Sequence, residues 1–507
     1  MSYILPTTTP SGSASDPAYS EIVGPSAAFG EIKVAEPYPQ VQRKFVLGTN
    51  EYLDRLIQHD GGTVTTSNGE LVVGTSTTTS SIAAYETKQI VKYDPGEGVE
   101  VRFTARFTSG VANTTQLAGI GDSEDGLFFG YNGTSFGVLR RTGGQAEIRT
   151  LTITAGATNS GNITITLNGG AVVVAVSAGD SIGDVCRKIA AADFGTAGGG
   201  WVPYDAGNRV VFKAIDTATR GGSYSFVDTD TTLVTSSGIA QTVAASAATD
   251  TWVASTAWSA DIADGTGTLP SMDWTKGNVF QIQYQWLGYG LMTFSVENPS
   301  TGRFIGVHRI EYANANTAPS LRQPDMPLCI FADNGSTTSD MIVRSASMAA
   351  FTDGVNATKG RVRFSISNEK SLTTTATNVI VLRVKSVFAS VTNRVRVYID
   401  EIDVGNNGTK TAEFDVYKDP GLVGAASWTD IDASNSVVEY DTATTGVSGG
   451  EREFGFIVGN GSAQGKTLSG GREIELEPGD MLVVQAGQTT GGSAGDLIAS
   501  LSWTEEF

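Results

Sequence analysis

Two histidines, His59 and His308, limit the catalytic chemistry of this chain. A metal site built on imidazoles, or a nucleophile activated by a histidine base, would have to use one of them. His308 lies in the run GRFIGVHRIEY, which alternates like a strand. A histidine in a strand is more often packed or hydrogen-bonded than catalytic, because catalysis also needs an orienting partner. We therefore predict no histidine-based active site and no enzyme.

Two acidic stretches carry the oxygen ligands that calcium prefers. Asp122, Glu124 and Asp125 lie in DSEDG, and Asp228 and Asp230 lie in DTD. Neither spacing matches the twelve-residue calcium loop, and acidic turns are more often solvated. The first stretch supplies the candidate calcium ligands, and we predict no cofactor and no other metal site.

The acidic and aromatic residues are compatible with carbohydrate binding or cleavage. A glycosidase needs two carboxylates about 5 to 9 Å apart, and 53 acidic residues offer many pairs without favouring one. Aromatic side chains can stack on sugars, although an aromatic residue in a strand is more often in the core. The aromatic candidates are Trp201, Tyr204, Trp252, Trp258 and Trp286.

The composition favours many short strands. The chain has 507 residues, 61 of them glycine, and only 17% are charged, which suits tight turns better than long ion-paired helices. This length is sufficient for about three domains. We therefore predict an all-β protein with several domains.

Charge and hydropathy exclude some partners. The net charge is −19, from 53 acids against 34 bases with no basic cluster, so the phosphate neutralisation needed for nucleic-acid binding has no source. No run of about 18 apolar residues predicts a membrane span, and MSYILPTTTP lacks a secretory signal. Two cysteines give no disulfide framework. We expect a protein made in a cytoplasm, without nucleic-acid or membrane binding.

The clearest sheet lies in residues 277–312. Apolar and aromatic residues alternate with polar ones, and glycines and Asn298-Pro299 interrupt the alternation. A period of two with turns between the runs is typical of an antiparallel meander. The alternating positions are Phe280, Ile282, Tyr284, Trp286, Met292, Phe294 and Val296.

Other strand runs extend this sheet on both sides. Residues 46–147 and 251–354 are predicted to form one split β-sandwich, and in it VEVRFTARF turns Val101, Phe103, Ala105 and Phe107 to one side. Residues 46–60 are the exception, since Tyr52, Leu53, Leu56 and Ile57 fit one short amphipathic helix capped by Thr49 or Asn50.

The stretch of residues 148–250 changes character and is predicted to be a small α+β domain inserted into a loop of the sandwich. It contains a hairpin at residues 168–170 and one helix capped by Asp180 or Ser181, with Cys186 on its apolar face. Residues 355–507 alternate again, and about seven or eight short strands predict a jelly roll.

Residues 1–45 are rich in proline and small residues, with isolated apolar side chains. Such a segment cannot bury enough surface to offset its own ordering entropy. We interpret it as an extended docking arm; the alternative is an arm folded back on its own sandwich. The proposed docking residues are Tyr3, Ile4, Leu5, Tyr19, Ile22, Phe29 and Tyr38.

Three parts of the chain resemble virion structural proteins of tailed bacteriophages. YDPGEGVEVRFTARF and the meander look like a laminin-G or concanavalin-like sandwich, and ITITLNGGAVVVAVSAGDSIGDVCRKIA is similar to small domains on phage tail proteins. SVVEYDTATTGVSGG, IELEPGDMLVVQAG and SLSWTEEF look like the terminal jelly roll of phage fibres. The resemblance covers about residues 45 to 507.

This resemblance implies a non-enzymatic virion protein, assembled in the host cytoplasm. It would be a tail-fibre, head-fibre or capsid-decoration subunit, expected as a homotrimer, whose arm docks on another virion protein of the capsid, portal or tail. One alternative is a receptor-binding lectin that attaches to a host glycan. A polysaccharide depolymerase is the third hypothesis.

Overall fold

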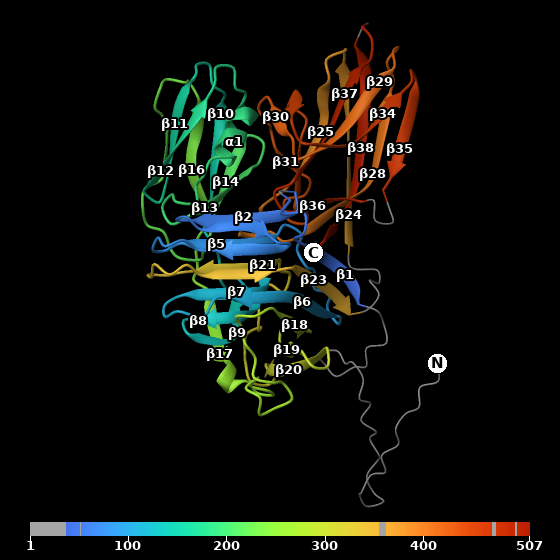
Figure 1. Ribbon diagram of the computed structural model, residues 1–507. Helices are drawn as coiled ribbons and strands as arrows, with labels where there is room; N and C mark the ends of the chain where they lie inside the picture. Colours follow the sequence, from blue (N-terminus) through green and yellow to red (C-terminus); the bar gives the residue numbers. More distant parts are fainter. Residues whose placement is uncertain (1–36, 51, 354–360, 469–472, 492–493) are drawn as a thin grey trace, which may run out of the picture.

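The computed structural model describes residues 37–50, 52–353, 361–468, 473–491 and 494–507. These residues form an all-β protein whose one α-helix is α1 (Ile182–Ala190). Figure 1 shows a broad sandwich below and two smaller β units side by side above it. No helix among the described residues is long and apolar enough to span a membrane.

The sandwich, residues 38–142 and 249–353, consists of two antiparallel sheets. The larger sheet has nine strands. They are β1 (Tyr38–Lys44), β3 (Thr63–Ser67), β4 (Glu70–Gly74), β6 (Gly98–Phe107), β18 (Asn278–Tyr284), β19 (Met292–Asn298), β20 (Arg303–Ile310), β22 (Ile342–Ser345) and β23 (Ser347–Asp353). The predicted meander is confirmed, since β18, β19 and β20 are consecutive neighbours in it.

The second sheet of the sandwich has seven strands, in the order β17-β9-β8-β7-β21-β5-β2. They are β2 (Asp54–His59), β5 (Ile82–Thr87), β7 (Thr115–Gly121), β8 (Gly126–Asn132), β9 (Ser135–Thr142), β17 (Thr249–Ala254) and β21 (Leu328–Asp333). Its strands come from both halves of the split sequence, so the sandwich closes only when the two halves meet.

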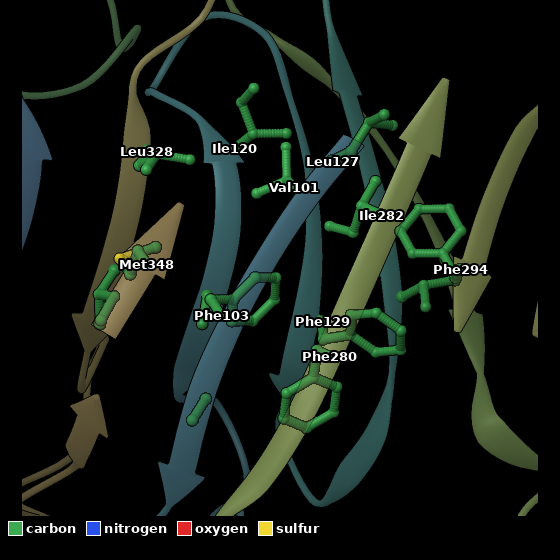
Figure 2. Close-up of a cluster of buried hydrophobic side chains, with 14 of the residues drawn as sticks. Val101, Phe103, Ile120, Leu127, Phe129, Phe280, Ile282, Phe294, Leu328 and Met348 are labelled. Atoms are coloured by element: carbon green, nitrogen blue, oxygen red, sulfur yellow. The ribbon is translucent and has the colours of Figure 1, made fainter. Parts of the chain in front are cut away.

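Alternating residues of both sheets fill the space between them. Figure 2 shows the centre of this core, where Phe103, Phe129, Phe280 and Phe294 lie together. The Phe129 and Phe280 rings have centroids 4.7 Å apart, a separation at which aromatic pairs add to the burial of apolar area. The prediction that Val101, Phe103, Ala105 and Phe107 share one face is confirmed, because all four are buried here.

The short helix predicted over residues 46–60 is wrong. Residues 54–59 form strand β2, and Asn50 accepts backbone bonds from Leu53 and Asp54 in a single turn before it. The apolar run was too short to decide between the two periods. Residues 54–59 form a strand because they pair with β5. This pairing buries Ile57 on one face of the sheet and places Asp54 beside Tyr85 on the other face.

The segment predicted as an arm overlaps the sandwich. Its last residues form β1, which pairs with β23 from Tyr38↔Thr352 to Lys44↔Ser347. Val41 and Phe45 are buried in the sandwich core. An arm in this chain therefore ends before residue 38, because the following strand completes the nine-stranded sheet.

The insert, residues 148–243, has two sheets of its own and helix α1. Its strands are β10 (Ile148–Ala155), β11 (Gly161–Leu167), β12 (Gly170–Val176), β13 (Trp201–Asp205), β14 (Arg209–Ala214), β15 (Ser225–Asp228) and β16 (Thr235–Val243). The predicted helix is confirmed with Ser181 as its cap, in a capping box with Asp184. Gln145 and Ser246 exchange backbone hydrogen bonds, so the two ends of the insert lie together.

The C-terminal module, residues 361–507, has main sheets of five and six strands and two short strand pairs. The strands are β24 (Arg361–Leu372), β25 (Thr377–Val384), β26 (Val387–Phe388), β27 (Val391–Thr392), β28 (Arg396–Asn406), β29 (Ala412–Lys418), β30 (Gly421–Val423), β31 (Thr429–Asp430), β32 (Val438–Asp441), β33 (Gly446–Ser448), β34 (Glu451–Val458), β35 (Ser462–Thr467), β36 (Ile474–Leu476), β37 (Met481–Gln488) and β38 (Gly495–Glu506). The module has more strands than the sequence predicted, because it also contains the short pairs β26–β27 and β30–β33 and the strands β24, β31 and β35.

Candidate functional site

A groove of about 470 Å³ lies between the insert and the outer face of the seven-stranded sheet. Alternation along the strands creates this face, since Ala118 and Phe129 point into the core while Leu117 and Phe128 form a separate apolar cluster outside it. The insert contributes residues 215–218 to the wall. We call this feature the sheet groove.

Two aromatic side chains line the sheet groove, on strands four apart in the sheet. Trp252 comes from the edge strand β17, where it lies opposite Leu139, and Phe331 comes from β21. Both side chains are half-buried and pack against the outer cluster. The Trp252 indole N–H is buried and has no acceptor among the described residues, so the ring face is the part of this side chain that a ligand would contact.

Polar side chains lie on the same face of the sheet, since Asp250 and Asp333 are two residues from Trp252 and Phe331 on the same strands. Arg141 and Asp250 form a two-bond ion pair, with both N–O distances 2.8 Å. Asp333 accepts a bond from the Gly335 amide at one oxygen, and the second oxygen has no partner in the described part of the chain. Burial raises the pKa of the Asp333 carboxyl, and the charge of Asp216 raises it further. Two acids from different modules therefore face the same groove.

The insert is held against the sheet beside this groove. Ile215 packs on Ile57 and Ala84 of the outer face. The ring of His59 is hydrogen-bonded to the Gly195 carbonyl and lies 3.1 Å from an Asp60 oxygen. The insert wall is therefore fixed in position before a ligand binds, which reduces the entropy cost of binding.

The three predicted calcium ligands lie together, but their partners are cations of the protein. Arg394 of the C-terminal module lies 2.8 Å from Asp122 and 3.3 Å from Glu124. Lys213 of the insert lies 3.5 Å from Glu124, and Arg322 of the sandwich lies 4.0 Å from Asp125. We call this cluster the charge junction.

Burial alone would raise the pKa of Asp122, but the charges of Arg394 and Lys213 lower it to about 2. Arg394 and Glu124 are also nearly completely buried. A cavity of about 60 Å³ beside the junction is lined by residues of the sandwich, the insert and the C-terminal module. Among the described residues, no group of three His, Cys, Asp or Glu side chains is arranged to hold a metal ion. The calcium site stays a prediction.

The other candidates are dispersed. Asp228 accepts bonds from Thr232 and Leu233 in a turn, and Asp230 accepts from Asn162. His308 is buried in β20 and accepts a bond from the Ser259 amide. Burial lowers the pKa of His308. None of these side chains lines the sheet groove.

Of the five aromatic candidates, only Trp252 lines the sheet groove. Trp201 and Trp258 are buried in the cores of the insert and the sandwich, and Trp286 packs against the sandwich core. Of the predicted docking residues, Tyr38 begins β1 and is 55% exposed. The others, Tyr3, Ile4, Leu5, Tyr19, Ile22 and Phe29, lie outside the described residues.

Sequence reasoning missed the polar side chains of the groove. Arg141, Asp216, Asp250 and Asp333 come from four separate stretches. No local spacing connects them, because the sandwich and the insert must both fold before they meet. The one sequence signal for this groove is Trp252, an aromatic residue that could stack on a sugar.

No family model matches the chain, and no curated protein matches it. Solved structures that resemble it include the carbohydrate recognition domain of Emp47p, at 10% identity and TM-score 0.24, covering 62% of this chain and 95% of that one. The legume lectin-like domain from Entamoeba histolytica has 11% identity and TM-score 0.23, covering 60% and 96%.

Lectin II from Ulex europaeus has 12% identity and TM-score 0.23, covering 62% of this chain and 100% of the lectin. All three likenesses have TM-scores below 0.5, so the argument for function rests on the residues of this chain. The resemblance to phage virion proteins stays a prediction.

Proposed function

We propose that this protein is a glycan-binding β-sandwich protein and that the sheet groove is its binding site. The observation that carries the proposal is a single groove lined by the half-buried aromatic side chains of Trp252 and Phe331 and by the carboxylates of Asp216 and Asp333. We keep host attachment, predicted from the sequence, as the biological setting.

The chemistry of an oligosaccharide fits this lining. A pyranose has an apolar C–H face, which an aromatic ring can cover, and hydroxyl groups on its edge that need acceptors and donors. Asp333 supplies an acceptor four strands away from the Trp252 ring, so the two side chains would contact different sugar units. Binding sites for small molecules typically combine an apolar lining with a few fixed polar groups.

The test is a glycan array with the purified full-length chain, followed by titration calorimetry of the best ligand. Trp252→Ala is expected to weaken binding at least tenfold, or about 1.4 kcal/mol. Asp333→Asn, which keeps the shape of the side chain, is expected to weaken it as well. Tyr289→Ala removes an exposed aromatic residue outside the groove and should bind like the unmodified chain. An array without ligands, or equal binding by all variants, would contradict the proposal.

A second candidate function is the structural one, a subunit of a virion fibre, appendage or decoration that forms a homotrimer. The charge junction favours it, because buried ion pairs fix three modules against one another, as a rigid appendage requires. Immunogold labelling of particles with antibody against residues 361–507 should mark the capsid or the tail. Particles without label would exclude this role, and a monomer in light scattering would exclude the trimer.

We propose that the groove binds without cleaving. The support is that two of the three acids that line it are held by arginines, Asp250 by Arg141 and Asp216 by Arg220, so the pair of available carboxylates that a glycosidase needs is not formed. The purified chain should release no reducing sugar from the polysaccharides it binds. Release that disappears in both Asp216→Asn and Asp333→Asn would instead establish the depolymerase hypothesis.

A further inference from the structure

A second cavity, of about 150 Å³, lies between the insert and the C-terminal module. Arg209 and Val211 of β14 line one side, and Arg383, Lys385 and Ser386 at the end of β25 line the other. None of these residues lines the sheet groove, so this is a separate feature. We call it the inter-module cleft.

The carboxylates of the inter-module cleft are already paired. Glu439 accepts from Arg383 at Nε and Nη2, at 2.9 and 2.5 Å. Arg383 also donates to the Ala206 carbonyl and stacks on the Trp428 ring at 3.9 Å, which uses the remainder of its guanidinium. Lys385 is paired with Asp430 at 2.7 Å. Two cations and two anions therefore neutralise each other.

Arg209 is the third cation of the cleft, and no carboxylate neutralises it. Its side chain makes no hydrogen bond or ion pair with the described residues, although it is only half-exposed. Burial lowers the pKa of Arg383, and the like charge of Arg209 lowers it further. Three cations and one carboxylate line the cleft, and the carboxyls of Asp430 and Asp205 lie close to Lys385 and Arg383. Arg209 is therefore the one cation of the lining without a carboxylate partner, in a chain whose net charge is −19.

The cleft has space and donors for a small anion. Its volume is well above the roughly 10–15 Å³ that one water needs. Gly479 borders it at φ +103°, and a Cβ there would have no atom within 4 Å. The Ser386 hydroxyl also lines it and has no partner among the described residues. A guanidinium with a nearby hydroxyl is a typical arrangement for binding sulfate, phosphate or carboxylate.

We propose that the inter-module cleft is a binding site for a small oxyanion, a sulfate, phosphate or carboxylate group, held by Arg209 and bordered by Arg383 and Ser386. The anion would supply Arg209 with the partner that it lacks in the protein. Because it would contact both, it would also stabilise their association. This inference is independent of the glycan proposal, which concerns a different cavity.

The test measures thermal unfolding of the full chain while sodium sulfate replaces sodium chloride at constant ionic strength, and then repeats this with phosphate. Sulfate is expected to raise the Tm by at least about 2 °C, because a ligand of the folded state shifts unfolding upward. In Arg209→Gln the rise should fall to a third or less. Without a multivalent anion, Arg209→Gln should unfold no lower than the unmodified chain, because Arg209 has no ion pair to lose.

Arg363→Gln is the matched control. Arg363 is 77% exposed and lies 3.3 Å from Asp400, far from the cleft lining, so its response to sulfate should equal that of the unmodified chain. Arg209→Lys keeps the charge and should keep most of the response. An equal response in Arg209→Gln and the unmodified chain would overturn the proposal.

Calorimetry distinguishes the sources of the anion. A sulfated disaccharide and its unsulfated form are compared with inorganic sulfate. If inorganic sulfate binds and Arg209→Gln abolishes the binding, the site takes a free ion. If only the sulfated sugar binds and Arg209→Gln abolishes that binding, the site takes a sulfate group carried by a glycan. If none of the probes binds, the proposal is wrong.

Discussion

Arg394 is a buried side chain that joins two modules through ion pairs. It comes from the C-terminal module, and its partners Asp122 and Glu124 belong to the sandwich. Its Nη1 donates to the carbonyl of Asp325, which adds a further bond to the sandwich. Removing one partner of a buried pair leaves the other charges uncompensated, and this costs more than the pair contributes.

The first prediction concerns this residue. Arg394→Met should destabilise the chain by about 3–5 kcal/mol, since Asp122 and Glu124 would stay buried and keep only the longer ion pairs, at 3.5–3.9 Å, with Lys213 and Arg322. Urea unfolding followed by tryptophan fluorescence measures it. Arg106→Met removes an exposed pair with Glu70 at 3.2 Å and should cost at most about 1 kcal/mol. Similar losses in both variants would show that the junction is not a special contact.

At the scale of elements, β1 corrects the interpretation of the N-terminal segment. Its strand pairs with β23, and Phe45 directly after it packs edge-on against Tyr85 with ring centroids 5.2 Å apart. A deletion of residues 1–45 would therefore remove a strand of the sandwich together with the predicted arm. Such a deletion cannot test docking by itself.

The second prediction follows from this packing. Phe45→Ala should cost about 3–5 kcal/mol, because it opens a cavity in the sandwich core. The measurement is the free energy of unfolding in urea. Tyr38→Ala, which removes a side chain 55% exposed at the start of the same strand, should change stability by less than about 1 kcal/mol. A small effect of Phe45→Ala would contradict the placement of this segment in the core.

Helix α1 contacts the C-terminal module through its first turn. A Cβ added at Gly183 would lie 1.8 Å from the Leu422 carbonyl oxygen of β30. Arg187 of the same helix donates to the Ser448 carbonyl. The small residue at position 183 therefore permits the close approach of the two modules.

The third prediction is that Gly183→Ala separates these elements. It should cost about 1–3 kcal/mol, since the backbones must move apart. Hydrogen exchange should become faster in β30 and in α1, while exchange in the sandwich sheets stays the same. Gly221→Ala, in an insert loop where a Cβ meets no atom within 4 Å, serves as the control. Unchanged exchange in β30 would contradict the contact.

At the scale of the whole molecule, buried carboxyls at the contacts of the C-terminal module respond to pH. Burial and the charge of Glu475 raise the pKa of Glu477 to about 8. Burial likewise raises the pKa of Asp205 and of Asp419 to about 7, and the charge of Asp480 contributes at Asp419. In the unfolded chain these groups titrate near their ordinary values, so folding favours their protonated forms.

The fourth prediction is therefore a loss of stability as pH rises. Between about pH 4 and 8 the folded chain holds more protons at these sites than the unfolded chain, so the free energy of unfolding decreases through this window. Asp122 acts in the opposite direction, since its pKa of about 2 adds stability that is lost as pH falls from about 4 through 2. We expect a maximum near pH 4.

Urea unfolding at pH 5, 7 and 9 measures this dependence. Glu477→Gln should flatten it, because the amide cannot ionise but can still accept the bonds from Arg396 and the Ile90 amide. A free energy of unfolding that increases from pH 5 to 9 would show that these carboxyls are ionised without cost.

Local patterns predicted much of the fold. The meander and the core face of VEVRFTARF followed from a period of two, and helix α1 with Ser181 as its cap followed from helical spacing. These elements could be predicted because their periodicity is long and their turn residues are distinctive. The helix prediction for residues 46–60 failed because four apolar residues fit both the helical and the strand period. Pairing with β5 makes this segment a strand.

The sequence alone determined the all-β class, the principal strands and the near-absence of histidine chemistry, because these depend on residue type and on neighbours a few positions apart. Only the tertiary structure placed Asp122 and Glu124 against Arg394, Trp252 and Asp333 in one groove, and Arg209 in one cleft with Arg383. Each of these groupings joins segments separated by tens to hundreds of residues. Their charges and contacts exist only after three modules have packed together, so no local pattern could specify them.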